Sequence, residues 1–224
     1  MRKREFLINA VRMVEVDGSS NVPTNLFYPS KGRALIGSAA IAATSRRNQL
    51  NEDFKIDLGN IDPSSSSPKR LFRSADGEKR SASALTGDFL HELLLHTRGW
   101  LDDNGISKST NILLAEPLSM QTDLASADWL SKYRRNLERI LSGKGFENIE
   151  FLPEPFAVFQ YYRYGHRHPI VAERTKHHAL VIDFGGGTFD VCIIETTKEG
   201  DISQSGRNSR PLAASSLRIP AAGD

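Results

Sequence analysis

The sequence predicts an α/β fold, and three observations lead to this class. Apolar runs rich in β-branched residues recur along the chain, as expected of buried strands. Between them lie segments whose apolar residues recur at helical spacing. Three consecutive glycines, Gly185, Gly186 and Gly187, separate the last two apolar runs and predict a tight connection between two strands. We therefore expect a mixed sheet with strands near 111–115, 149–152, 179–183 and 190–196, the last two paired antiparallel as a hairpin.

The N-terminal part of the chain predicts short elements. Apolar and charged residues are interspersed over 5–16, a pattern compatible with one strand or a short helix. The polar cluster at 17–21 is typical of a turn. Residues 25–28 predict a short strand ended by Pro29, and the small residues at 37–43 predict the beginning of a helix.

The middle of the chain divides into a polar segment and two regular helices. Residues 47–81 include four consecutive serines and lack alternating apolar runs, so we expect mostly loop, poorly ordered or forming a loose cap. Helical spacing over 85–101 predicts a helix that ends at Gly105. A second helix begins at Trp129 and is closed by Gly143.

A strand–helix–strand–helix order is expected from 111 to 164, with the last helix running from Pro153 to about Tyr164. Such an order requires a sheet with right-handed crossovers. After Thr197 the sequence turns polar, and residues 203–224 carry no strong pattern.

Composition limits the classes of partner and compartment. The 29 Lys and Arg residues nearly balance the 27 Asp and Glu residues, which argues against nucleic acid or an acidic membrane as the main partner. No apolar stretch approaches transmembrane length. The single cysteine, Cys192, excludes an internal disulfide framework and suits a reducing compartment. We expect a cytoplasmic protein.

Histidines form two pairs that resemble metal-ligand spacing, His166 with His168 and His177 with His178. No cysteine or carboxylate cluster supports a structural zinc site beside them. We therefore expect these histidines in a solvated loop.

The glycine run carries the strongest functional signal. Successive backbone N–H groups in such a turn form a concave anion site suited to a phosphate group. Asp183 and Asp190 flank the glycines, where carboxylates can hold the water shell of Mg²⁺. The alternative is a structural hairpin with a flexible tip, although such hairpins tend to use Asn-Gly or Asp-Gly.

Residues 183–191, Asp-Phe-Gly-Gly-Gly-Thr-Phe-Asp-Val, resemble the second phosphate-binding motif of the actin-like ATPase superfamily. The Thr-Phe-Asp ending looks most like the seventy-kilodalton heat-shock chaperones. Residues 68–73 resemble that family's Lys-Arg-Leu-x-Gly-Arg segment, and residues 153–157 its Asn-Glu-Pro helix start. Residues 22–43 resemble a segment that follows the family's first hairpin. Asp57-Leu58-Gly59 imitates the first phosphate motif, but no Thr-Thr follows, so we interpret it as coincidental.

The resemblance implies an actin-like ATPase (ribonuclease H-like) fold that is only partly represented. Most of lobe I would come from residues 1–46 and 82–165, with 47–81 as a heavily trimmed inserted subdomain. Residues 166–178 would cross between the lobes, and 179–224 would begin lobe II with the phosphate-binding hairpin.

The resemblance also implies ATP and Mg²⁺ as cofactors and gives each matched residue a role. Asp183 and Asp190 would position Mg²⁺ through water, and Glu154 would order the metal shell or the attacking water. Lys69 would neutralise charge on the γ-phosphate. The backbone of four residues would form the phosphate cradle: Gly185, Gly186, Gly187 and Thr188.

The sequence also departs from the family pattern. The first phosphate motif, Asp-x-Gly-Thr-Thr, has no counterpart in residues 1–30, and the later motifs of lobe II are not found. We therefore expect a fragment of an ATP-hydrolysing chaperone domain that is weak or inactive by itself. Unfolded peptides or co-chaperones would be partners only of a full-length protein. Two alternatives remain open: a non-catalytic remnant that binds a partner, or a relative of actin-like filaments or sugar kinases.

Overall fold

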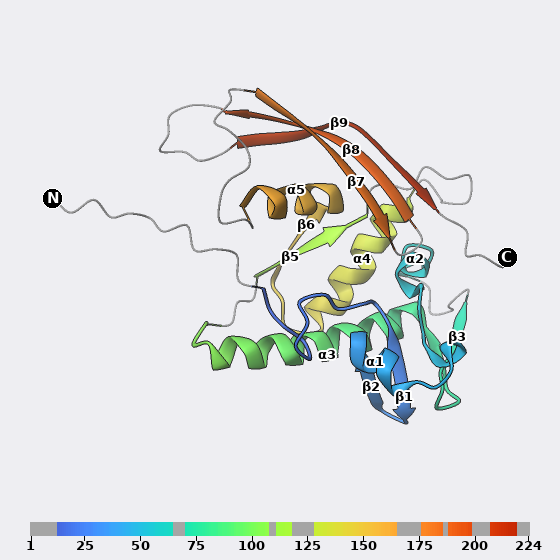
Figure 1. Ribbon diagram of the computed structural model, residues 1–224. Coiled ribbons are helices and arrows are strands. Elements are labelled where there is room, and N and C mark those ends of the chain that lie inside the picture. The colour runs from blue at the N-terminus through green and yellow to red at the C-terminus, as the bar shows by residue number, and fades with distance from the viewer. Residues whose placement is uncertain are drawn as a thin grey trace. The chain divides into compact units, whose positions relative to one another are not determined.

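The computed structural model describes residues 13–64, 70–107, 111–117, 128–164, 176–185, 188–198 and 207–218. It combines helices with small sheets, which confirms the expected α/β class (Figure 1). The chain divides into two compact units. The first unit consists of Val14–Leu114 and Asp123–Glu150, and the second of Met1–Met13, Ala115–Thr122 and Phe151–Asp224.

The first unit opens with a tight turn and a hairpin. Val16 and Ser19 exchange backbone hydrogen bonds around the predicted turn. Strands β1 (Leu26–Ser30) and β2 (Arg33–Ile36) pair antiparallel. Pro29 does not end β1 as expected. Instead the ladder register shifts between Phe27 and Ser30, because proline has no N–H to donate. Helix α1 (Gly37–Ala43) then begins where the sequence predicted a helix.

Helix α3 (Ala82–Asp103) forms the main wall of the first unit and confirms the helix expected over 85–101. The Ser81 hydroxyl caps its N-terminus by accepting the backbone N–H of Ala84 at 3.2 Å. Gly105 ends it in the left-handed region, with φ +64°. One face of its N-terminal half completes a hydrophobic core made by Val16, Leu26, Tyr28, Ile36, Phe54, Phe72, Ala82, Leu85 and Phe89.

The segment 47–81 forms part of this core, so the expectation of a loose cap is wrong for its described residues. Much of it is loop, as predicted, but it contains η1 (Arg47–Gln49), α2 (Phe54–Leu58) and an antiparallel hairpin of β3 (Leu71–Arg73) with β4 (Lys79–Ser81). Phe54 is 2% exposed and Leu58 1% exposed. Their i,i+4 spacing places both on one side of a single helical turn, which is enough to anchor an otherwise polar segment.

Helix α4 (Trp129–Ser142) packs against α2 and ends before Gly143, as predicted. The indole Nε1 of Trp129 donates a hydrogen bond to the carbonyl of Ile56 at 3.1 Å. The buried amide of Asn136 donates to the carbonyl of Leu58, the last residue of α2, at 2.9 Å, and to that of Ile61 at 3.0 Å. These bonds tie carbonyls at the C-terminal end of α2 to side chains of α4.

We expect Asn136→Ala to lower the free energy of unfolding of the first unit by about 2–3 kcal/mol, because two buried carbonyls would lose their donor. Urea denaturation followed by circular dichroism measures the change. Asn104→Ala is the control, because the exposed Asn104 amide donates to a single carbonyl, that of Trp100. Equal losses in the two variants would contradict the proposed role of Asn136.

Strands β5 (Asn111–Glu116) and β6 (Asn148–Pro153) pair with each other and confirm the strands expected near 111–115 and 149–152. The amide of Asn148 donates to the side-chain oxygen of Asn111 at 2.7 Å. The two strands therefore begin at the same end of the pair, as in the parallel arrangement that a strand–helix–strand unit requires. The boundary between the two compact units runs through both strands.

The second unit contains an antiparallel sheet of three strands, β7 (Lys176–Gly185), β8 (Thr188–Lys198) and β9 (Arg207–Arg218). Helix α5 (Glu154–Tyr164), predicted from the sequence, covers one face of this sheet (Figure 1). The core between them is formed by Phe156, Phe159, Val181, Cys192 and Ile194.

One expectation for the second unit is wrong, and one of its strands was not predicted. Strand β9 occupies residues in which the sequence showed no pattern. Its pairing with β8 shifts between Ile193 and Ile194, opposite Pro211, so a proline-containing strand is tolerated at the edge of the sheet. His177 and His178 lie in β7 and not in a loop. The pair His166 and His168 lies outside the described residues.

The described strands form four separate sheets, three of two strands and one of three, instead of one mixed sheet. The α/β class is therefore confirmed, while the actin-like arrangement remains a proposal. Among the described helices, none combines the length and the apolar character needed to cross a lipid bilayer.

Candidate functional site

The β7–β8 hairpin holds most of the residues that the sequence singled out. The two strands pair antiparallel along their whole length, from Lys176 opposite Thr197 to Gly185 opposite Thr188. This confirms the expected hairpin and leaves Gly186 and Gly187 as a two-residue connection. Those two glycines lie outside the described residues. Hairpin connections of two residues favour turns with φ > 0, which glycine adopts without steric cost.

The ladder brings Asp183 and Asp190 together. They are register partners, two pairs away from the Gly185–Thr188 pair that closes the hairpin. Directly opposed residues of an antiparallel ladder share one face of the sheet, with Cβ atoms about 4.5–5.5 Å apart. Like charges directly opposite each other destabilise such a ladder.

Glu154 is the first residue of α5 and is half-buried. It belongs to the same compact unit as the hairpin. Helix α5 is fixed against β7 and β8 through Phe156 and Phe159, which pack on Val181, Cys192 and Ile194. Glu154 and the two aspartates therefore lie on elements that pack against each other.

Only part of the predicted site lies within the described residues. Lys69 lies outside the described residues. For Asp183, Asp190, Gly185 and Thr188 the strand positions and the register are described, and the side chains are not. What the structure shows is thus the backbone frame of the hairpin.

Where side chains are described, no three His, Cys, Asp or Glu residues gather as metal ligands. His178 and Glu195, which are register partners on β7 and β8, contact each other with Nε2 and Oε2 2.9 Å apart. Cys192 is buried under α5, and burial raises the pKa of its thiol. A protonated thiol without access to solvent packs as a small apolar group.

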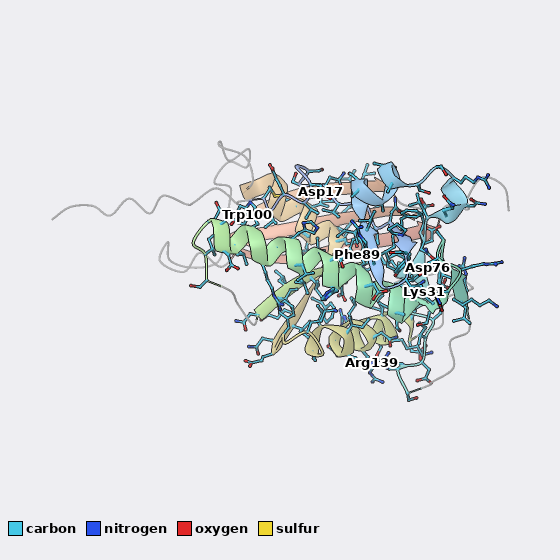
Figure 2. All side chains as sticks on the ribbon, turned by 90° about the horizontal axis from the view of Figure 1, so that it is seen from below. Asp17, Lys31, Asp76, Phe89, Trp100 and Arg139 are labelled. Carbon is cyan, nitrogen blue, oxygen red and sulfur yellow. The ribbon has the colours of Figure 1, made fainter. Side chains whose placement is uncertain are left out.

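Sequence reasoning missed a second group of ionisable residues, in the first unit. Arg80 makes a bidentate ion pair with Asp76, with nitrogen–oxygen distances of 2.9 and 2.7 Å. The Arg80 guanidinium also lies 3.8 Å from the ring centre of Tyr28, whose hydroxyl donates to Asp88 at 2.7 Å. Asp76 lies near one end of α3, and Trp100 near the other (Figure 2). The i,i+4 spacing of Asp76 and Arg80 was the sequence signal for an ion pair. That spacing is typical of a helix, whereas here the two residues lie in a β-hairpin.

The ionisation of this cluster follows from its contacts. The hydrogen bonds from Arg80 lower the pKa of Asp76, and those same bonds raise the pKa of Arg80. Burial, followed by the hydrogen bond to Asp88, raises the pKa of Tyr28. At neutral pH Asp76 and Arg80 are therefore charged and Tyr28 is neutral. Because the charges are paired within the cluster, we assign it a structural role.

A scan of the sequence against protein-family models found no match, and a search of curated proteins found none. The assignment of function therefore depends on the motif and on the geometry of the hairpin.

Proposed function

We propose that this chain carries the phosphate-binding hairpin of an actin-like nucleotide-binding domain of the heat-shock-chaperone type. The observation that supports the proposal is the β7–β8 register, which sets Asp183 opposite Asp190 and Gly185 opposite Thr188. A connection of two glycines then separates the strands. Backbone N–H groups at such a turn suit a phosphate, and carboxylates beside it suit a hydrated divalent cation.

The paired aspartates fit a cation better than they fit a purely structural hairpin. Like charges directly opposite each other destabilise a ladder. A divalent cation held between them, through its water shell, turns that repulsion into attraction. Mg²⁺ bound there would supply neutralising charge for the phosphates of ATP.

The other matched residues would assist in the manner that the resemblance implies. Glu154, supported by α5, would orient the attacking water, and Lys69 would neutralise charge on the terminal phosphate. Phosphoryl transfer depends mainly on positioning and electrostatic stabilisation, so a few fixed charged groups are sufficient for such a role. The proposed partner is a nucleotide in the cytoplasm, and peptides or co-chaperones would engage a longer protein.

We expect the chain by itself to bind Mg-ATP with a Kd of about 0.1 mM or weaker, and to hydrolyse it no faster than background. The matched residues form one face of a phosphate site, because residues 1–30 contain no counterpart of the first phosphate motif. A phosphate held from one face stays hydrated, and its contacts act in a high dielectric. Losing a single donor from a water-excluding site already costs about 10²–10³-fold in rate.

Nuclear magnetic resonance detects binding in this range. The backbone amide signals of Gly185, Gly186 and Gly187 should shift with Mg-ATP, and the shifts should disappear in Asp183→Asn. Asp103→Asn, which removes an exposed carboxylate at the end of α3, is the control and should behave as the wild type.

The outcomes separate the alternatives. Shifts that depend on Asp183, without release of phosphate above background, are the expected result and support the proposal. Identical titrations of the wild type and Asp183→Asn would refute the proposal. Submicromolar binding that Asp183→Asn abolishes would show that other residues complete the site. The prediction of weak affinity would then be wrong.

A further inference from the structure

A pocket in the first unit is not used by the proposed function. Its volume is about 470 Å³, and it opens widely to solvent. Two arginines and two asparagines contribute to its wall, together with one carboxylate and two apolar side chains. The lining residues are Asn48, Leu50, Asn51, Glu52, Arg70, Phe72 and Arg73.

The floor of the pocket is fixed by packing and backbone hydrogen bonds. Phe72 belongs to the core of the first unit. The backbone of Asn51 exchanges two hydrogen bonds with Leu26 of β1, at 2.8 and 3.1 Å. Asn51 is only 3% exposed, so its position does not depend on a ligand.

The side-chain amide of Asn51 is not satisfied by the protein. Its Nδ2 is buried and has no hydrogen-bond partner. Its Oδ1 has one distant donor, the hydroxyl of Ser74 at 3.5 Å. Exchanging the two amide atoms would leave the oxygen unpaired in place of the nitrogen. An unpaired buried polar group costs about 1–3 kcal/mol.

The arginines supply positive charge above this floor. Arg73 is exposed, and no described residue pairs with it. Arg70 uses one nitrogen, Nη1, for its ion pair with Asp57 at 2.9 Å, and its guanidinium stacks 4.5 Å from the ring centre of Phe72. Stacking and the ion pair hold Arg70 in place while its other N–H groups remain available.

We infer that this pocket binds a small organic anion through a carboxylate or a phosphate group. The planar guanidinium of Arg73 is suited to bidentate hydrogen bonding with either group. Arg70 adds a positive charge from a fixed position. Asn51 is a neutral residue of the same lining. Glu52 makes the wall less positive, which favours a ligand of low charge over a polyanion. The inference uses residues of the first unit only and is independent of the β7–β8 hairpin.

The full-length chain is titrated at constant ionic strength with inorganic phosphate, with glutarate, and with glutaramide as an uncharged analogue. The side-chain amide signals of Asn51 report binding by nuclear magnetic resonance. We expect saturable shifts with phosphate or glutarate and none with glutaramide. Arg73→Gln should weaken the binding at least about tenfold, the loss that one charge-assisted contact of about 1.4 kcal/mol represents.

Two further variants keep the test independent of folding. Arg33→Gln removes an exposed arginine of β2 that does not line the pocket, and it should change the affinity less than twofold. Asn48→Asp adds a negative charge to an exposed position of the wall and should weaken binding. Saturation by phosphate alone or by glutarate alone supports the inference and identifies the group. Absence of saturation, equal binding of glutaramide, or equal losses in Arg73→Gln and Arg33→Gln would overturn it.

Discussion

Replacing Gly59 by alanine is expected to lower the free energy of unfolding of the first unit by about 3 kcal/mol. A Cβ atom at Gly59 would lie 2.6 Å from Cδ2 of Trp129, and closer still to its Cε2 and Nε1. Trp129 has little room to move, because it is buried and stacks on Tyr133 with ring centres 5.1 Å apart. Overpacking of a filled core costs about 1–3 kcal/mol. Displacing the indole would also break its bond to Ile56, which contributes about 0.5–1.5 kcal/mol.

A glycine elsewhere in the first unit provides a control for which the free energy of unfolding is expected to change in the opposite direction. Gly99 lies in α3, where an added Cβ would meet no atom within 4 Å. Gly99→Ala should therefore stabilise the protein by about 0.5–1 kcal/mol through the helix propensity of alanine. Chemical denaturation of both variants measures the difference. A Gly59→Ala protein as stable as the wild type would show that α2 and α4 do not pack as described.

Removing Arg80 is expected to cost about 3 kcal/mol at neutral pH. The Asp76 side chain is 2% exposed and that of Arg80 15% exposed, so Arg80→Ala leaves a carboxylate buried without its partner. Breaking one side of a buried ion pair typically costs about 3–5 kcal/mol. The variant also loses the contact of the guanidinium with the Tyr28 ring.

The matched control is an exposed ion pair that joins the β1–β2 connection to the hairpin of Arg80. Lys31 pairs with Glu78 at 2.8 Å, but the two side chains are 78% and 48% exposed. Solvent screens such a pair, so Lys31→Ala should change stability little. If the two variants lost equal stability, Arg80 would not have the buried role assigned to it.

The effect of Arg80→Ala should depend on pH in a defined direction. Arg80 lowers the pKa of Asp76, so the ion pair contributes its full stability above the unfolded-state pKa of about 3.9. That contribution is lost as the pH falls through the lowered pKa of the folded state. Denaturation series at pH 7 and below about pH 3 should therefore show the difference between wild type and Arg80→Ala shrinking in acid. A difference that stayed constant would assign the loss to packing alone.

The sequence by itself determined the elements whose signals are local. Helices α3 and α4 follow from apolar spacing within each helix and from the glycines that end them, Gly105 and Gly143. The β7–β8 hairpin follows from two apolar runs joined by glycines, and its register then sets Asp183 opposite Asp190. These features depend on residues within one helix or one hairpin, so a pattern of a few residues is enough to predict them.

Only the tertiary structure decided the features that depend on distant partners. Strand β9 contains Pro211 and few apolar residues, and it is a strand because β8 offers it an edge. Segment 47–81 joins the core because Phe54 and Phe72 meet side chains from elements far away in the sequence. Asp76 and Arg80 form a buried pair because Tyr28 packs over the guanidinium. In each case the stabilising energy comes from contacts between distant segments, and local propensity does not encode such contacts.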